Sequence, residues 1–190
     1  MPCSRPTTPA GGFTLIELMV TVSVGAILTA IAIPAFNSFV LNDRDSAQIN
    51  SLAYSFNYAR SEAVKRDTAV TVCPANSGSN VCNNTLTWAG GWIVSYLDPV
   101  NGATVLQAVP ALAGSNTVTP AGSATTGIRF LSSGMASTLT VPMAQSLTIK
   151  VCDTRGASFA RDVEVTVAGR VAASQKPGFK VDGTTALACP

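Results

Sequence analysis

Near its start the chain reads Gly11-Gly12-Phe13-Thr14-Leu15-Ile16-Glu17-Leu18-Met19-Val20, and this stretch decides the fold. It opens an apolar run that continues to Ile33 and stops at Pro34. A helix rises 1.5 Å per residue, so this run spans roughly 30 Å, the thickness of the hydrocarbon core of a membrane. We therefore expect a membrane-spanning helix over residues 13–33, preceded by a leader at residues 1–12.

Glu17 is the one charged residue inside this apolar run. An ionised carboxylate costs about 2.5–3.5 kcal/mol at the centre of a bilayer, so the side chain needs a partner. The most natural partner is a free α-amino group, which cleavage of the chain between Gly12 and Phe13 creates.

Residues 12–17, Gly-Phe-Thr-Leu-Ile-Glu, resemble the class III signal of type IV pilins and type II secretion pseudopilins. In that family a prepilin peptidase cuts after the glycine, here Gly12, and methylates the new N-terminus, here Phe13. The resemblance implies that Glu17 pairs with the N-terminus of a neighbouring pilin in the fibre. It also implies a single-pass protein of the inner membrane with its head domain in the periplasm, assembled into a pilus or pseudopilus.

Two simpler interpretations compete with this one. Ala30-Ile31-Ala32 has the small-x-small pattern of a secretory signal cleavage site, but Pro34 crowds that site and Glu17 interrupts the apolar region. A plain single-span anchor is the other interpretation, and it leaves Glu17 without a role.

The totals limit the classes of function. The chain has 190 residues and a formal net charge of +2, and it contains no histidine. Removing the leader and the whole N-terminal helix as far as residue 66 leaves about 125 residues, enough for one domain with a core. The absence of histidine removes the commonest general base, and no phosphate-binding Gly-rich motif appears, so we expect neither an enzyme nor a cofactor.

Four cysteines remain after the leader is removed: Cys73, Cys82, Cys152 and Cys189. An even number of cysteines in an exported domain favours disulfides, and three connectivities are possible. We favour Cys73–Cys82, which closes a short polar loop, together with Cys152–Cys189, which fixes the C-terminal tail to a strand. A zinc site is the rival, but no C-x-x-C spacing supports it, so no metal is expected.

Beyond Pro34 the apolar residues recur at spacings of three and four, which predicts an amphipathic helix over residues 34–66. Residues 67–190 then form a β-rich head domain with a polar tail from residue 174. Strands are expected at 69–73, 92–97, 104–109, 127–131, 147–152 and 162–167, and residues 110–127 are expected to form a loop. The predicted fold is α+β: a long N-terminal helix, its first half transmembrane, packed on an antiparallel sheet in the manner of type IV pilins.

The head domain resembles the GspH/FimT family of minor pilins and pseudopilins. The resemblance rests on residues 59–66, 70–74, 91–94 and 128–130, and on Gly134 and Gly169-Arg170. Within residues 59–63 we expect Arg60 and Glu62 to point outward, and we expect Trp92 and Ile93 to fill the groove between helix and sheet.

The family implies one of two functions. FimT-like members belong to type IV pili, and some of them bind double-stranded DNA during natural transformation through a G-R-x-R motif near the C-terminus. GspH-like members are minor pseudopilins that act in protein secretion without DNA binding. Here Arg170 is present, but Ala172 replaces the second arginine of the motif. Because DNA affinity comes mainly from neutralised phosphates, the candidate DNA-binding set is taken from the whole basic C-terminal third: Arg170, Lys176, Lys180, Arg155, Arg161 and Lys150.

Overall fold

The computed structural model of the chain describes residues 12–75, 78–79, 81–83, 87–120, 126–139 and 145–189. Residues 1–11, which make up nearly all of the predicted leader, lie outside the described residues. The described chain falls into two compact units, residues 1–40 and 41–190. A single helix, α1 (Leu15–Arg66), begins in the first unit and ends in the second. The two helical segments predicted at residues 13–33 and 34–66 are therefore one helix, which continues through Pro34.

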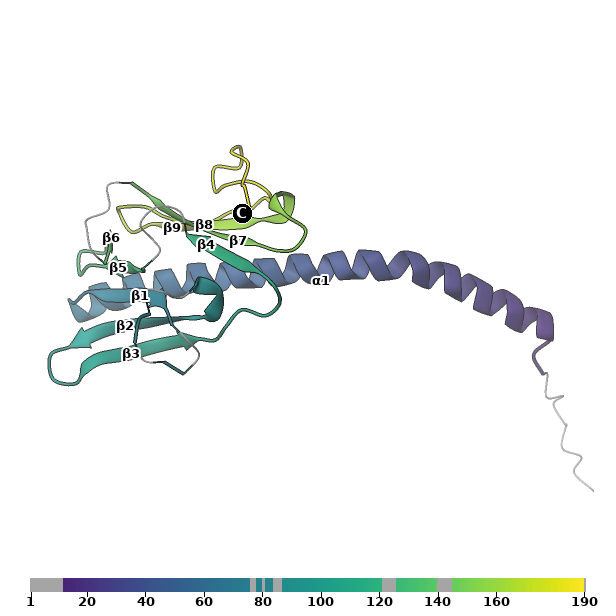
Figure 1. The fold of residues 1–190 in the computed structure, drawn as a ribbon, viewed down its shortest axis with the longest axis horizontal. Coiled ribbons are helices and arrows are strands. Elements are labelled where there is room, and N and C mark those ends of the chain that lie inside the picture. Colours follow the sequence, from purple (N-terminus) through teal and green to yellow (C-terminus); the bar gives the residue numbers. More distant parts are fainter. Residues whose placement is uncertain are drawn as a thin grey trace, which may run out of the picture. The chain divides into compact units, whose positions relative to one another are not determined.

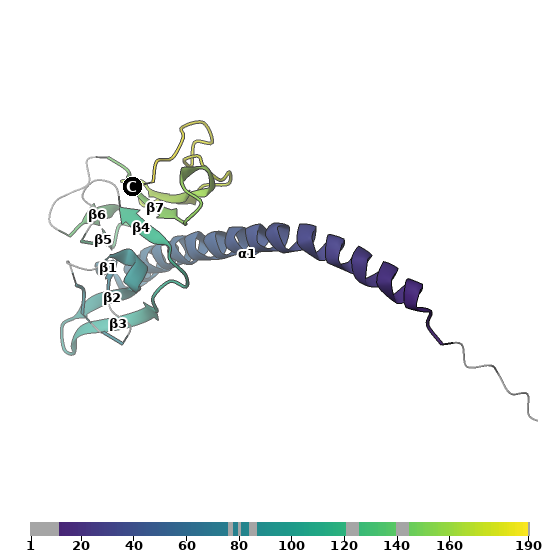
Figure 2. The same ribbon diagram turned by 45° about the vertical axis from the view of Figure 1, so that its right-hand side comes forward.

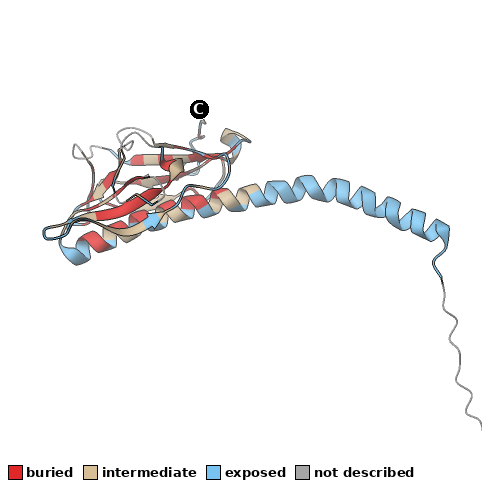
Figure 3. Ribbon diagram, turned by 60° about the horizontal axis from the view of Figure 1, so that its bottom comes forward, coloured by how far each residue is buried: buried red, intermediate tan, exposed pale blue. Residues whose placement is uncertain are grey.

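The described part of the first unit, residues 12–40, consists mainly of an apolar helix, and all of these residues are exposed, shown in pale blue in Figure 3. Its few hydroxyl groups bond within the helix: Thr21 donates to the carbonyl of Leu18, and Ser23 donates to the carbonyl of Met19. These bonds satisfy polar groups that a hydrocarbon environment leaves without partners. By length and composition, α1 is the one helix among the described residues that is able to cross a membrane.

The part of α1 in the second unit carries the predicted apolar stripe. Its buried apolar residues recur at helical spacing and face the core: Ile49, Leu52, Phe56, Ala59 and Ala63. Figures 1 and 2 show this part of α1 against two antiparallel sheets. The predicted helix-on-sheet fold is confirmed, with two sheets in place of one.

The first sheet has five strands in the order β3-β2-β1-β5-β6. Every neighbouring pair in this sheet is antiparallel. A short 3₁₀ helix, η1 (Trp88–Gly90), precedes β2. The strands are β1 (Val70–Pro74), β2 (Trp92–Asp98), β3 (Gly102–Val109), β5 (Ile128–Phe130) and β6 (Ala136–Thr138).

The second sheet has four antiparallel strands in the order β4-β7-β8-β9. The strands are β4 (Thr117–Pro120), β7 (Leu147–Cys152), β8 (Arg161–Val165) and β9 (Val171–Ala173), with a 3₁₀ helix, η3 (Ala157–Phe159), between β7 and β8. The prediction of a loop over residues 110–127 is wrong at β4. This strand forms because Val118 is buried opposite Val151. That tertiary contact cannot be predicted from the flanking sequence, which is rich in Ala, Gly and Ser.

The core lies between α1 and the inner faces of both sheets. Phe56 of α1 meets Trp88 edge to face and lies beside Phe130. The indole N–H of Trp92 donates to Ser55 Oγ at 2.9 Å, so this buried polar group is satisfied. Ile93, in contrast, does not lie in the groove as expected: β2 alternates, so Ile93 points to the other face of the sheet and packs with Cys73 and Ala75.

Both favoured disulfides are present. Cys73 pairs with Cys82, and Cys152 pairs with Cys189. The second disulfide fixes the C-terminal tail to the end of β7, where Leu187 packs against Cys152 and Ala160. The tail is therefore folded onto the second sheet along most of its length.

Two side chains expected to point outward turn toward the protein. Glu62 is 7 % exposed and accepts hydrogen bonds from Arg66 and Lys65. The hydrogen bond from Arg66 holds the pKa of Glu62 below its ordinary value. Arg60 donates to the carbonyls of Gly134 and Ala168, at 3.1 and 3.3 Å, and so joins α1 to a turn of each sheet. Long cationic side chains can lie along the protein surface in this way and still reach polar groups.

Candidate assembly site and DNA-binding surface

Glu17 lies in the first turn of α1. Thr14 caps the helix, because its Oγ1 accepts a hydrogen bond from the backbone N–H of Glu17 at 3.2 Å. Thr14 and Glu17 are spaced as in a capping box, where a carboxylate is favoured by the partial positive charge of the helix N-terminus. The local sequence therefore both starts the helix here and places one carboxylate at its start.

The surroundings of Glu17 are apolar and exposed. Phe13 is 84 % exposed, and every residue described from 12 to 40 is exposed. Among the described residues, no cation lies within ion-pair distance of Glu17. The carboxylate and the long apolar surface are thus both available to another molecule or to lipid. Among the described residues, neither packs against or pairs with another part of the chain.

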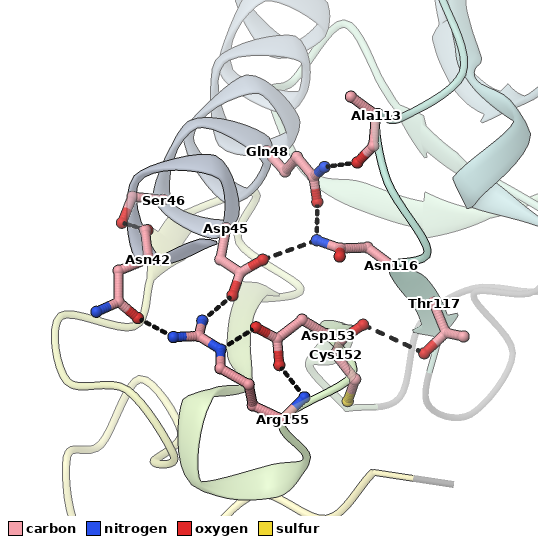
Figure 4. A network of polar contacts seen from close by, with 10 residues as sticks. All are labelled: Asn42, Asp45, Ser46, Gln48, Ala113, Asn116, Thr117, Cys152, Asp153 and Arg155. Atoms are coloured by element: carbon pink, nitrogen blue, oxygen red, sulfur yellow. Dashed lines mark hydrogen bonds and ion pairs between the residues drawn. The ribbon is translucent and has the colours of Figure 1, made fainter. Parts of the chain in front are cut away.

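Arg155 differs from the other members of the candidate DNA-binding set, because its side chain is only 15 % exposed. As Figure 4 shows, its guanidinium donates to Asp45 and Asn42 of α1 and to Asp153. It also stacks over the ring of Phe159 at 4.1 Å. The charge of Arg155 is committed to two carboxylates inside the protein, so we remove this residue from the DNA-binding set.

The same network continues to the loop before β4. Asn116 donates to Asp45 and to Gln48, and Gln48 donates to the carbonyl of Ala113 (Figure 4). Burial, with the charge of Asp153 adding to it, raises the pKa of Asp45 above its ordinary value. The network joins α1 to the segment before β4 and the segment after β7, which lie at the same end of this strand pair, and it is structural in character.

Lys150 and Arg161 are also separated from a common surface. The Nζ of Lys150 donates to the carbonyl of Ala188 at 2.7 Å and so holds the C-terminal tail. Arg161 begins β8 opposite Val151 and is partly buried. Alternation along β8 places Arg161 on the opposite face of the sheet from Asp162. These two cations therefore do not extend a single basic patch.

Arg170, Lys176 and Lys180 remain exposed, but acidic groups and an aromatic ring face them. Arg170 shares a recess of about 50 Å³ with Glu164. Lys176 lies 3.8 Å above the ring of Phe179. Lys180 attracts the buried carboxylate of Asp162 electrostatically. The basic character read from the sequence is thus largely balanced by Asp162 and Glu164 in space.

The structure shows why the first position of the G-R motif, Gly169, is a glycine. It has φ +76°, and a Cβ atom at this position would overlap the carbonyl oxygen of Gly134. That same oxygen accepts from Arg60, so three residues quoted for the family resemblance meet at one point. The sequence signal was present in the two glycines and Arg60, but their meeting depends on the packing of two sheets.

Metal binding has no support in the described residues, which contain no group of three or more His, Cys, Asp or Glu side chains placed around a common point. The four cysteines of the head domain are held in the two disulfides.

Comparison with known families agrees with the geometry. Residues 48–169 match the family described as type II transport protein GspH, and residues 9–33 match the prokaryotic N-terminal methylation motif. The chain belongs to the GspH family. In sequence, no curated protein matches the chain.

Two solved structures resemble this member of the GspH family in fold. One is the type IV minor pilin FimU of Pseudomonas aeruginosa strain PAO1, with a TM-score of 0.53 and 21 % identity over 70 % of this chain and 90 % of that one. The other is the minor pseudopilin EpsH of the Vibrio cholerae type II secretion system, with a TM-score of 0.50 and 12 % identity over 73 % and 97 %. The protein is accordingly a membrane-anchored minor pilin or pseudopilin with a type IV pilin-like fold.

Proposed function

We propose that the chain is a minor pilin of a type IV pilus, made as a precursor, cleaved between Gly12 and Phe13, and methylated at Phe13. Its head domain lies in the periplasm before assembly. In the fibre, the carboxylate of Glu17 pairs with the α-amino group of a neighbouring pilin. The role is one of assembly, without catalysis and without a cofactor. The alternative is a minor pseudopilin of a type II secretion system, which uses the same processing and the same contact.

The observation that carries this proposal is the position of Glu17. A carboxylate in the first turn of an exposed apolar helix, without a cation among the described residues, is costly in lipid unless another chain supplies the charge. A fibre of parallel subunits supplies it, because cleavage leaves each subunit with a free amino group four residues from its own glutamate.

Intact mass spectrometry of the protein from cells with and without prepilin peptidase tests the processing step. The proposal predicts a chain that begins at Phe13 and carries one added methyl group when the peptidase is present. The full precursor should accumulate when the peptidase is absent. Replacing Gly12 with valine should give the precursor in both strains, whereas cleavage at Ala32 in either strain would point to an ordinary secretory signal.

Deletion of the gene separates the two kinds of fibre. If the chain is a type IV minor pilin, the deletion strain should have fewer surface pili and should secrete folded proteins normally. A pseudopilin predicts normal pili and a loss of secretion, and this result would replace the first alternative with the second.

DNA capture is a second candidate function, and the candidate DNA-binding residues that remain for it are Arg170, Lys176 and Lys180. These three exposed cations lie in the C-terminal part of the head domain, and Arg170 follows the motif glycine. The acidic neighbours Asp162 and Glu164 weaken the field that would attract phosphates. If these three cations bind DNA, we expect the binding to be weak and to decline steeply as the salt concentration rises. Each phosphate contact adds about one unit to the slope of log affinity against log salt concentration.

The test is a fluorescence titration of a short DNA duplex with the mature chain in detergent at several salt concentrations. Arg170→Ala should abolish most of the affinity, whereas Lys65→Ala, which removes an exposed cation of α1, should change it little. Equal loss in both variants would indicate a non-specific charge effect, and no binding at low salt would leave the assembly role alone.

A further inference from the structure

The outer face of the first sheet carries a row of polar side chains that no step above uses. Thr71 of β1 lies directly opposite Ser95 of β2 and Arg129 of β5, and Arg129 lies opposite Ser137 of β6. Residues opposite one another in antiparallel strands point to the same face, with Cβ atoms about 4.5–5.5 Å apart. Four strands therefore place one guanidinium and three hydroxyl groups in a line.

The alternation of β5 explains why this row faces away from the helix. Ile128 and Phe130 are fully buried in the core against α1, which directs Arg129 to the opposite face. In β1, Val70 and Val72 are buried in the same core, which directs Thr71 outward beside Arg129. The position of the arginine is thus fixed by core packing on both sides and does not depend on a loop.

Three members of this row line a recess of about 280 Å³. Thr71, Ser95 and Arg129 supply its polar part. Its apolar part is supplied by Leu97, Ala103 and Leu139. Leu97 is 73 % exposed, although it belongs to a strand whose other large apolar side chains are mostly covered. The recess therefore combines an anion-binding centre with an apolar wall.

Among the described residues, Arg129 has no carboxylate partner. All ten acidic side chains of the sequence lie in the part of the chain that the structure describes, and none is within 4.0 Å of Arg129. In the described part of the chain, the cations that form ion pairs are Lys65, Arg66 and Arg155. Arg129 is partly buried and therefore loses part of its hydration without gaining a counter-charge. An external anion would supply that charge.

We propose that this recess binds an acidic side chain on an extended segment of another protein. The planar guanidinium of Arg129 takes the carboxylate through paired N–H donors, and the hydroxyl groups of Thr71 and Ser95 donate to its remaining lone pairs. In an extended segment the residues two positions from the acidic residue share its face, and aliphatic side chains at those positions contact Leu97, Ala103 and Leu139. This binding concerns the head domain alone and does not depend on how the N-terminal helix assembles.

A peptide fits the recess better than a nucleic acid does. Binding to a DNA backbone draws its free energy from several phosphates neutralised along a strand, and the described residues that line the recess include a single cation. The apolar wall makes no favourable contact with a charged phosphodiester, whereas it can pack against aliphatic residues near an acidic side chain in a protein. The charge of Arg129 and the apolar wall beside it together favour an acidic peptide segment as the ligand of the recess.

The probe is the peptide acetyl-Leu-Ala-Glu-Ala-Leu-amide, whose Glu and Leu side chains share one face when it is extended, titrated into the isotope-labelled mature chain in detergent and followed by NMR. We expect saturable shifts at the amides of Thr71, Ser95 and Arg129 in the millimolar range or below, weakening with salt. The matched peptide with glutamine in place of glutamate should bind at least fivefold more weakly. Arg129→Gln should abolish the shifts, and Arg170→Gln should leave them unchanged.

Two further variants protect the test against misfolding of Arg129→Gln. Arg129→Lys keeps the charge but loses the paired donors, so binding should fall severalfold. Thr71→Val removes one hydroxyl at nearly constant volume and should also weaken binding.

Three results would overturn the proposal. Shifts that persist in the Arg129 variants would indicate non-specific contact, and no shifts at 20-millimolar peptide, a concentration about tenfold above the expected range, would show that the recess has no such affinity. Tighter binding of inorganic phosphate or of a DNA duplex through Arg129 would make it a phosphate site.

Discussion

Arg155 Nη2 lies 3.1 Å from Asp45 Oδ2, in an interior contact between the loop after β7 and helix α1. The same guanidinium pairs with Asp153, so one cation balances two buried carboxylates. A cluster of this kind is favourable only when all of its members are present, because an unpaired buried charge is costly. The contact therefore determines how α1 meets the second sheet, and it removes a cation from the surface.

Replacing Arg155 with methionine should destabilise the head domain. The change leaves Asp45 and Asp153 buried without a counter-charge, so we expect the free energy of unfolding to fall by about 3 kcal/mol. Denaturant unfolding at neutral pH measures this loss. Adding Asp45→Asn to the variant should recover part of it, and Arg170→Met, a change at an exposed cation, should cost little. An equal effect of the two arginine variants would contradict the interior role of Arg155.

Replacing Gly169 with alanine should be far more harmful than replacing Gly183. Both glycines have positive φ, +76° and +72°, so both changes carry a backbone cost of about 1 kcal/mol. Only at Gly169 would the new Cβ overlap another atom, the carbonyl oxygen of Gly134, whereas the space around Gly183 is open. We expect an additional loss of about 2 kcal/mol or more for Gly169→Ala in thermal or denaturant unfolding. Equal losses would show that the two turns do not meet closely.

Asp162 should make stability depend on pH between about 4 and 6. The residue is 1 % exposed, and burial raises its pKa to about 6, from 3.8 in an unfolded chain. Glu164 raises the pKa further, whereas Ser174, the backbone of Val181 and Lys180 lower it, and Lys150 lies opposite on β7. The folded state therefore holds a proton that the unfolded state has released, so this contribution is complete below pH 3.8 and is lost as the pH rises through 6.

Asp162→Asn removes that loss. Relative to the unmodified protein, the variant should gain free energy of unfolding as the pH rises from about 4 to about 6, reaching at most about 3 kcal/mol and then remaining constant. Denaturant unfolding at a series of pH values measures the difference directly. A difference that does not change with pH would mean that Asp162 titrates near its ordinary value in the folded protein.

The two disulfides should contribute unequally. Cys152–Cys189 closes 37 residues and Cys73–Cys82 closes 9, so loop entropy predicts losses of about 4 and about 2.5 kcal/mol when each pair is replaced by serine. Loss of the first pair should also free the tail, so that trypsin cleaves after Lys180 more rapidly; Lys176 is followed by Pro177 and is not a trypsin site. If cleavage in this variant stayed as slow as in the unmodified protein, the bond from Lys150 to Ala188 and the packing of Leu187 would be holding the tail without the disulfide.

The features predictable from the sequence were those encoded locally. The apolar run with Glu17 and the stripe from Ile49 to Ala63 follow from spacing along the chain, and the short loop between Cys73 and Cys82 favoured their pairing. The strand β4 did not, because its four residues are stabilised by their pairing with β7 and by the burial of Val118. Local composition around it resembles a loop.

The candidate DNA-binding set illustrates the same limit. A count of basic residues after Arg129 suggested a cationic face, but a count does not show which cations have partners. Folding brings Asp45 of the helix to Arg155 and places Asp162 and Glu164 among the remaining cations. Conversely, Arg129 was one of the basic residues and part of a family-like strand, but it was not placed in the candidate set. The register with Thr71, Ser95 and Ser137 is what gives it unusual surroundings.

The most direct test of the proposed assembly role is the amount of this protein in purified fibres from cells that carry Glu17→Gln. This substitution keeps the size of the side chain and removes only its charge, while Glu164→Gln serves as a control at a carboxylate of the head domain. We predict normal cleavage after Gly12, a normal level in the membrane, and at least a tenfold lower level in the fibres for the Glu17 variant alone. Normal incorporation of that variant would contradict the pairing of Glu17 with a neighbouring N-terminus, and with it the assembly mechanism proposed for this chain.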